Sequence, residues 1–267
     1  MSSYGRMSAV WRRVPDDIDE RLQQIFQRHP GCRIFFRADD IAIPSRRQNL
    51  LLETFVRHDM PLCAAIVPTW ITPGRWRQIC AVVGDRHELF CWHQHGYSHR
   101  NHQTEGKKQE FGPGLEAQLK RRHVIRGRDR LAEILGEHFL PVFTPPWNRL
   151  DQDTLQILGE EGFLAISRYR GDRLAAPPGL PDLACNVDLH TRREANAREG
   201  WQALLAELEQ AMAGGLAGIM LHHNRMNGTS FLFLERLLGL LGRQRDLRLC
   251  LYPRLLGELH GKEAGRP

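Results

Sequence analysis

Side chains capable of metal binding and proton transfer gather at five places in the sequence, each directly after a short apolar run. These places are Asp39-Asp40, His93 to His99, Thr144 to Arg149, Asp188 to His190, and His222 to Asn224. The second place is the densest, because His93, His95, His99 and His102 fall within ten residues, where 13 histidines in 267 residues would average about half a histidine. Buried structural histidines rarely cluster in this way, so the clustering favours a metal site over an ordinary polar loop.

The spacing of these residues predicts a metal-assisted hydrolysis. His95 and His99 stand at i and i+4, which would place two imidazoles on one face of a helical turn. With one carboxylate of Asp39-Asp40 they make a His-His-acid set, which in catalytic zinc sites leaves a position open for water. Successive side chains at a strand end point in different directions, so the other carboxylate stays free to take a proton. A divalent ion lowers the pKa of its bound water toward about 7, and an imidazole of His222 or His223 would protonate the leaving group.

The elements that must position these residues alternate between strand-like apolar runs and segments of helical spacing. The runs cover 33–37, 62–67, 88–92, 139–143, 163–167, 183–187, 217–221 and 247–251, and the helical candidates include 47–58, 115–135, 153–161, 201–212 and 231–241. Such alternation predicts an α/β protein with parallel strands and right-handed crossovers. Seven or eight units fit a single (β/α) barrel better than an open doubly wound sheet, which is the alternative. In either fold the carboxyl ends of the strands bring the polar residues to one face.

The amino-acid composition indicates the class of protein and the partners it is expected to have. The chain is 42% hydrophobic and 25% charged, which is typical of a soluble globular protein. Its formal charge is +6, and all but four of its 37 basic residues are arginine, but acidic residues are interspersed, so we expect no nucleic-acid partner. The six cysteines form no C-x-x-C pair and are expected as free thiols. No apolar run reaches about 18 residues and no export signal is visible, so we expect a cytoplasmic protein without a transmembrane segment.

Three regions are expected along the chain. Residues 1–30 are predicted to form a helical segment packed on the barrel, residues 31–260 the barrel itself, and residues 261–267 a frayed tail. The oligomeric state is left open.

Taken in order, the motifs resemble those of the polysaccharide deacetylases, the NodB-like group that forms carbohydrate esterase family 4. The matching residues are Asp39-Asp40 after an apolar strand, His95-Gly96-Tyr97-Ser98-His99, Pro145-Pro146-Trp147 and Leu221-His222-His223. The resemblance spans about Arg33 to Asn224 and implies a distorted (β/α) barrel that removes an N-acetyl or O-acetyl group from a saccharide or glycoconjugate. It further implies that Asp39 is the general base and that Asp40, His95 and His99 bind a divalent metal, with zinc expected first. By the same resemblance, the backbone N–H of Trp147 helps to hold the oxyanion, and Pro146, Trp147, Asn148 and Leu221 line the substrate site.

Several positions depart from the family pattern. Ile41 stands where the family usually has glycine, and Thr144 replaces the arginine that orients the base, for which Arg37 and Arg149 are the nearest substitutes. The late acidic and aromatic motif of the family is missing, and the closest approach to it is Asp188 to His190.

Two neighbouring histidines are candidates for the general acid that protonates the leaving group. The spacing Leu-x-His selects His223, whereas Met220-Leu221-His222 selects His222, and strand alternation sends these neighbours to opposite faces. We favour His223 and keep both. Trp70, at the end of the second run, either stacks on a sugar ring or caps the core.

Two other functions stay open. One is an amidohydrolase that acts on a small non-sugar amide with the same site. The other is a catalytically silent homologue that binds a glycan or a partner protein, which the Thr144 substitution suggests.

Overall fold

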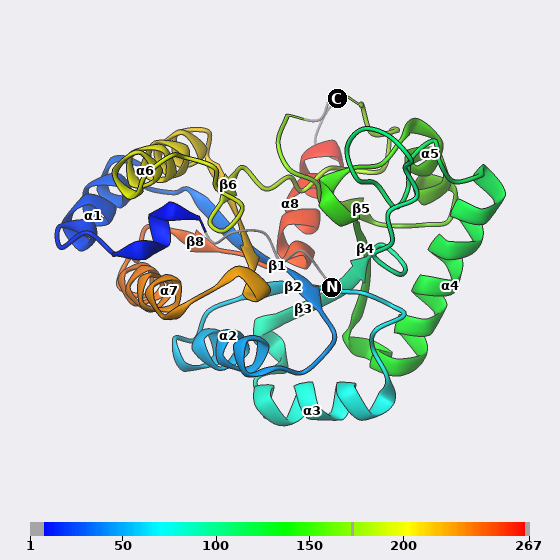
Figure 1. Ribbon diagram of the computed structural model, residues 1–267, viewed down its shortest axis with the longest axis horizontal. Helices are drawn as coiled ribbons and strands as arrows, with labels where there is room; N and C mark the ends of the chain where they lie inside the picture. The colour runs from blue at the N-terminus through cyan, green and yellow to red at the C-terminus, as the bar shows by residue number, and fades with distance from the viewer. Residues whose placement is uncertain (1–7, 172–173, 265–267) are drawn as a thin grey trace.

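Strands and helices alternate along residues 8–171 and 174–264, the part of the chain that this computed structural model describes (Figure 1). The strands are β1 (Arg33–Ile41), β2 (Leu62–Ile66), β3 (Phe90–His95), β4 (Phe139–Thr144), β5 (Ala165–Ile166), β6 (Val187–Asp188), β7 (Leu216–His222) and β8 (Arg248–Leu249). The α-helices are α1 (Ile18–Arg28), α2 (Arg46–Arg57), α3 (Pro73–Val83), α4 (Ala117–Leu135), α5 (Gln152–Glu160), α6 (Ala197–Ala213), α7 (Gly228–Leu241) and α8 (Tyr252–Ala264). Short 3-10 helices are η1 (Ala9–Arg12), η2 (His87–Leu89), η3 (Gly136–His138), η4 (Pro146–Asn148) and η5 (His223–Arg225). Each predicted run overlaps a strand, and each predicted helix overlaps a helix.

The strands form one parallel sheet that curls into a distorted barrel, which confirms the predicted fold class. The strand order is β5-β4-β3-β2-β1-β7-β6, and β8 pairs with the start of β1. This order runs once around the sheet without the reversal that defines a doubly wound fold, so the alternative is excluded. Irregular backbone spans the gap between β5 and β7. There the Leu183 N–H donates to the Ile166 carbonyl at 2.8 Å and the Asn186 N–H to the Gly218 carbonyl at 2.9 Å.

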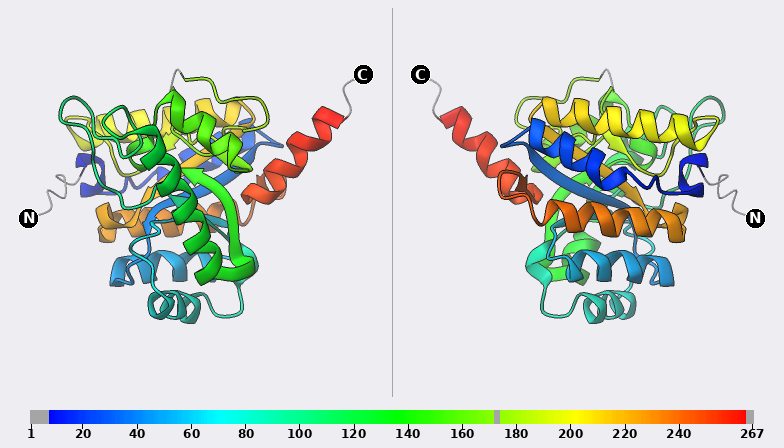
Figure 2. Two further views of the ribbon diagram at one scale, coloured as in Figure 1. Left: turned by 90° about the vertical axis from the view of Figure 1, so that its right-hand side faces the viewer. Right: turned by 90° about the vertical axis from the view of Figure 1, so that its left-hand side faces the viewer.

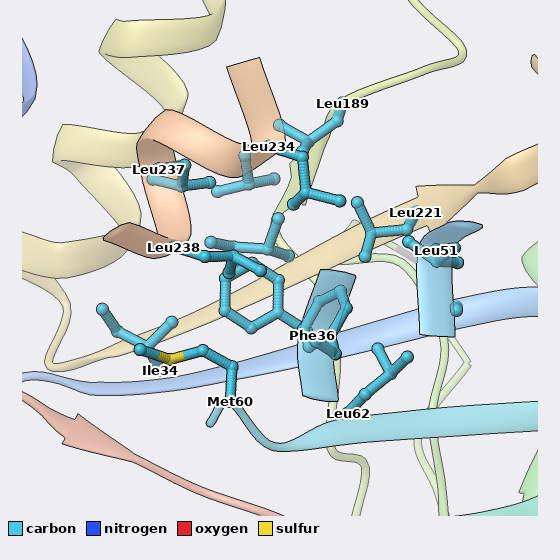
Figure 3. Packing of buried hydrophobic residues seen from close by; sticks show 14 of the residues in the cluster. Ile34, Phe36, Leu51, Met60, Leu62, Leu189, Leu221, Leu234, Leu237 and Leu238 are labelled. Carbon is cyan, nitrogen blue, oxygen red and sulfur yellow. The ribbon is translucent and has the colours of Figure 1, made fainter. Parts of the chain in front are cut away.

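The two faces of the sheet have different partners. On the outer face, alternate apolar side chains of β1 and β7 pack against α2 and α7, as Figure 3 shows for Phe36, Leu221, Leu51 and Leu234. On the inner face, Arg37 and Asp39 of β1 lie beside Met220 and His222 of β7, their partners in register. Side chains alternate in direction along each strand, so one face of the sheet is apolar and packs on the helices, and the inner face carries the polar groups.

The first residue of α8 packs inside the barrel. Tyr252 is fully buried among inner-face residues such as Phe35 and Cys63, and its hydroxyl donates to Ser167 Oγ at 2.9 Å. The rest of α8 projects from the body of the fold (Figure 2). This helix continues to Ala264, so the first four residues of the predicted tail at 261–267 are helical. Residues 265–267 lie outside the described part.

The N-terminal segment is helical where it is described and packs on the barrel helices. Trp11 of η1 makes edge-to-face contact with Trp201 of α6, with 5.3 Å between ring centroids, and α1 packs against α7 and α6. Residues 1–7 of the predicted segment lie outside the described range. The six cysteines are free thiols. Among the helices described, none is long and apolar enough to cross a membrane.

Candidate active site

Asp39 and Asp40 directly precede Ile41, the last residue of β1, and both take part in the same polar cluster. Plain alternation would send them to opposite faces of the sheet. The pairing of β1 with β2 shifts register between Ala38 and Ile41, and Asp40 has a φ of 65°. A bulge of this kind re-aims a side chain. It leaves Asp39 on the inner face beside His222 and turns the Asp40 carboxylate toward His95 and His99.

Asp40, His95 and His99 converge as a candidate metal centre. Their ligand atoms lie within 4.8 Å of one another, with Asp40 Oδ1 at 3.4 Å from His95 Nε2 and 3.2 Å from His99 Nε2. His95 and His99 come together through a different backbone conformation from the helical turn that their spacing predicts. His95 ends β3, and the chain from Gly96 to His99 is a loop without a helical turn, with φ near +55° at both residues.

Glycine is required at position 96. A Cβ there would collide with the Glu110 carboxylate and the Pro146 ring, and the residue has a φ of 56°. Glu110 itself is fully buried and accepts the backbone N–H groups of Tyr97 at 3.1 Å and Ser98 at 2.6 Å. The loop that carries His99 is therefore braced from a residue 11 positions further on. Sequence reasoning did not find Glu110, and the only available signal was an acidic residue in a basic polar stretch.

The donor set fits a divalent cation. The Nδ1–H of His95 points at the Thr144 carbonyl, 3.0 Å away, which leaves Nε2 as the atom facing Asp40. Asp40 Oδ1 is buried without a hydrogen-bond partner among the described residues. Burial alone would raise the pKa of Asp40, but His95 and His99 hold it well below its usual range. Two imidazole nitrogens and a carboxylate oxygen are ligands that zinc and neighbouring divalent ions accept.

Asp39 forms a buried two-point ion pair with Arg37. Arg37 Nε donates to Oδ1 at 2.8 Å and Nη2 donates to Oδ2 at 2.9 Å, and Asp39 is 2% exposed. Burial would raise the pKa of Asp39, but the charge of Arg37, with smaller contributions from His95 and His222, lowers it. Asp39 is therefore ionised at neutral pH.

Of the two arginines considered as substitutes for the missing family arginine, Arg37 reaches Asp39 and Arg149 does not. Arg149 donates to the Lys108 carbonyl at 3.2 Å. Thr144, at the family arginine position, contacts His93 Nε2 through its hydroxyl at 2.9 Å. Arg37 is held in turn by Asn148, whose Oδ1 accepts from Nη2 at 2.6 Å, so Asn148 supports the ion pair from the loop after β4.

The structure also separates the two candidate acids. His222 Nε2 lies 3.6 Å from Asp39 Oδ2, whereas His223 is 2% exposed and its imidazole lies beside the Asp39 backbone. Burial lowers the pKa of His223 to about 4, so its imidazole is neutral at pH 7. The geometry therefore favours His222, which is the register partner of Asp39, over our preferred His223, and the identity of the acid stays a prediction. His190 supports this strand end by accepting the His222 backbone N–H at 3.0 Å.

Two tryptophans flank the metal-binding cluster. The ring of His99 contacts both of them, with ring centroids 4.4 Å from Trp147 and 5.5 Å from Trp70. Both tryptophans are partly exposed, and Trp147 has a φ of 56°. Pro146 is buried, and its ring lies against Gly96. Leu221 was predicted to line the substrate site, and this is wrong. It is 0% exposed in the outer core (Figure 3), because it is one residue out of phase with the inner face, where Met220 lies instead.

Several solved structures share the fold of this chain. A protein from Mycobacterium smegmatis described as a polysaccharide deacetylase aligns at a TM-score of 0.62 and 16% identity, over 88% of this chain and 92% of that one. The fold is that of the polysaccharide deacetylases. The same fold appears in the peptidoglycan deacetylase PdaC from Bacillus subtilis, with a TM-score of 0.53, 12% identity and coverage of 87% and 93%. A CE4 family pseudoenzyme also shares it, with a TM-score of 0.51, 13% identity and coverage of 85% and 68%. No family model and no curated protein sequence matches the chain.

Proposed function

We propose that this protein is a metal-dependent deacetylase that hydrolyses an N-acetyl or O-acetyl group of a saccharide or glycoconjugate, with zinc as the ion. One observation carries the proposal. The Asp40, His95 and His99 cluster lies beside a second carboxylate, Asp39, that is buried, ionised and paired with Arg37. The polysaccharide deacetylase fold supports the choice of reaction and substrate class.

Each residue of the site has a separate role in the proposed hydrolysis. When bound by Asp40, His95 and His99, a divalent ion supplies a Lewis acid that lowers the pKa of water and polarises a carbonyl. Asp39 accepts the proton of the attacking water, and Arg37 keeps it ionised and oriented. His222, 3.6 Å from Asp39, gives a proton to the leaving amine or alcohol as the bond to the acetyl carbon breaks. The Trp147 backbone N–H donates to the oxygen on which negative charge develops.

The aromatic pair favours a sugar over a small amide. Trp70 and Trp147 are both partly exposed, and both contact the ring of His99. Flat apolar surfaces of this kind suit the face of a sugar ring, and a small amide would leave most of them uncovered. A non-sugar amidohydrolase is the second candidate, and a silent binding protein is the third.

An acetate-release assay on the zinc-loaded protein tests the proposal, with acetylated sugars and simple amides as substrates. Asp39→Asn is expected to lower the rate about 100-fold or more while zinc binding persists. His95→Ala and His99→Ala are expected to lose zinc uptake, and His102→Ala, a matched change in the same loop outside the cluster, is expected to keep it. Equal rates for the wild type and Asp39→Asn would refute catalysis, and faster release from simple amides would select the second candidate.

The same assay decides between the two histidines. His222→Gln is expected to lower the rate about 100-fold. His223→Gln is expected to act through stability, with a much smaller effect on the rate of the folded protein, because the His223 imidazole is buried and neutral and His222 is the histidine beside the Asp39 carboxylate. The reverse order of effects would restore His223 as the acid.

A further inference from the structure

Ser167 holds the guanidinium of Arg37 at the one nitrogen that does not bond Asp39. Arg37 Nη1 donates to the Ser167 carbonyl at 2.9 Å and to the Ser167 hydroxyl at 3.0 Å. Nε and Nη2 donate to the two oxygens of Asp39, and Nη2 also donates to Asn148. A guanidinium is planar and rigid, so a contact at Nη1 sets the angle at which the other two nitrogens meet the carboxylate.

The Ser167 hydroxyl has a partner for its hydrogen and for both of its lone pairs. Ser167 Oγ donates its single hydrogen to the Leu183 carbonyl at 2.7 Å. It accepts from Arg37 at 3.0 Å and from the hydroxyl of Tyr252 at 2.9 Å. A hydroxyl has one hydrogen and two acceptor sites, so these three contacts use all of its bonding capacity. The Ser167 hydroxyl is therefore fixed in direction, and Tyr252 is one of the three groups that fix it.

Tyr252 is itself held firmly inside the barrel. It is the first residue of α8, and the rest of that helix projects from the body of the fold (Figure 2). Its ring is 0% exposed and makes edge-to-face contacts with Phe35 of β1 and His93 of β3, with ring centroids 5.5 and 5.0 Å away. His93 is fixed in turn by the Thr144 hydroxyl, 2.9 Å from Nε2. The Tyr252 hydroxyl therefore reaches Ser167 from a ring that two other strands keep in place.

We propose that Tyr252 is a positioning residue for the general base: through Ser167 it holds the guanidinium of Arg37, and Arg37 holds Asp39. This inference rests on the proposed function. A phenylalanine would fill the same space and keep both ring contacts, and burying a hydroxyl costs free energy unless it is bonded, so packing does not explain the hydroxyl. The inference also brings α8 into the site, although this helix lies outside the span 33–224 that carries the family motifs.

The kinetic test uses the zinc-loaded protein with an N-acetylglucosamine oligomer as substrate. Tyr252→Phe removes the hydroxyl and keeps the ring, and kcat is expected to fall about 3- to 10-fold, as for one lost hydrogen bond, with KM and zinc affinity unchanged. Ser167→Ala is expected to lower kcat at least as much. Both variants interrupt the same network, so adding Tyr252→Phe to Ser167→Ala is expected to have no further effect on kcat. The control is Tyr169→Phe, a partly buried tyrosine that packs on the same inner cluster but does not belong to this network, and it is expected to keep kcat.

Nitrogen NMR of the Arg37 guanidinium separates this inference from the proposed function, because it needs no turnover. Arg37 has acceptors at all three nitrogens, so its Nη–H signals, assigned through the bonds of the side chain, are expected to be resolved in the wild type. They are expected to shift and broaden in Tyr252→Phe and Ser167→Ala and to stay in place in Tyr169→Phe.

Three outcomes decide the matter. Unchanged Arg37 signals in Tyr252→Phe would overturn the positioning role, whether or not acetate is released. Shifted signals with an unchanged kcat, or a loss that comes only from KM, would also overturn it and leave Tyr252 a structural residue. Shifted signals in a protein that releases no acetate would support the hold of Tyr252 on Arg37 and refute only the proposed function.

Discussion

Replacing Arg37 with glutamine should strongly destabilise the protein, because it leaves the Asp39 carboxylate buried without its counter-charge. Arg37 is 0% exposed and Asp39 is 2% exposed, and two hydrogen bonds of 2.8 and 2.9 Å join them. Two unit charges about 4 Å apart at an effective dielectric constant of about 20 attract by about 4 kcal/mol. Removing one partner of such a pair typically costs about 3–5 kcal/mol. We therefore expect the free energy of unfolding to fall by about 4 kcal/mol at pH 7.

The assay is urea unfolding of the metal-free protein, followed by circular dichroism, in a double-mutant cycle with Asp39→Asn. The double variant is expected to be more stable than the sum of the single effects by about 2 kcal/mol or more, because neither charge is then buried alone. Arg13→Gln is the control, since Arg13 also forms an ion pair at 2.6 Å but is 76% exposed, and it should cost less than about 1 kcal/mol.

Two outcomes would refute this reasoning. The first is a loss below about 1 kcal/mol in Arg37→Gln, comparable to the surface control. The second is additivity of the two single substitutions within about 0.5 kcal/mol, which would mean that the two side chains are not coupled.

Three further predictions follow from the buried groups around the site. Glu110→Gln weakens the brace on the Tyr97 and Ser98 N–H groups, so zinc affinity in a titration should fall about tenfold or more; unchanged affinity would contradict a bracing role. The pKa of His223 is about 4 when folded and about 6.5 when unfolded, so the unfolded state takes up the proton first, and stability should be lost as the pH falls from about 6.5 to 4. Urea unfolding at pH 7 and pH 4.5 measures this loss in the free energy of unfolding, which should reach up to about 3 kcal/mol in the wild type and be smaller in His223→Gln. Equal losses in the wild type and the variant would contradict the prediction. Leu221→Ala should lower the free energy of unfolding by about 2–5 kcal/mol without raising KM, and a higher KM at full stability would return Leu221 to the substrate site.

Local pattern was enough to predict the barrel and the composition of the site. Apolar runs alternating with helical spacing specify parallel strands, and parallel strands place their carboxyl ends at one face, so Asp39, Asp40, His95, His99 and the residues after β4 and β7 were expected together. Their residue types predicted a metal site before any distance was known. This works because alternation and residue chemistry depend only on neighbouring residues.

The tertiary structure alone decided which of several equivalent candidates occupies each role. Arg37 and Arg149 were equally plausible partners for Asp39, and only the inner-face position of Arg37 in β1 brings it there. His222 lies opposite Asp39 because β1 and β7 pair in that register, and the same register sends Leu221 to the outer core.

Backbone geometry decided the rest. The shift between Ala38 and Ile41 aims Asp40 at the histidines, and Glu110 braces a loop that is not the helical turn that the spacing suggested. Strand register, a bulge and a loop brace are set by contacts between residues distant in the sequence or by a single backbone irregularity. A sequence therefore determines the chemistry available at each strand end, and the packing of the whole barrel determines which side chain is in position to use it.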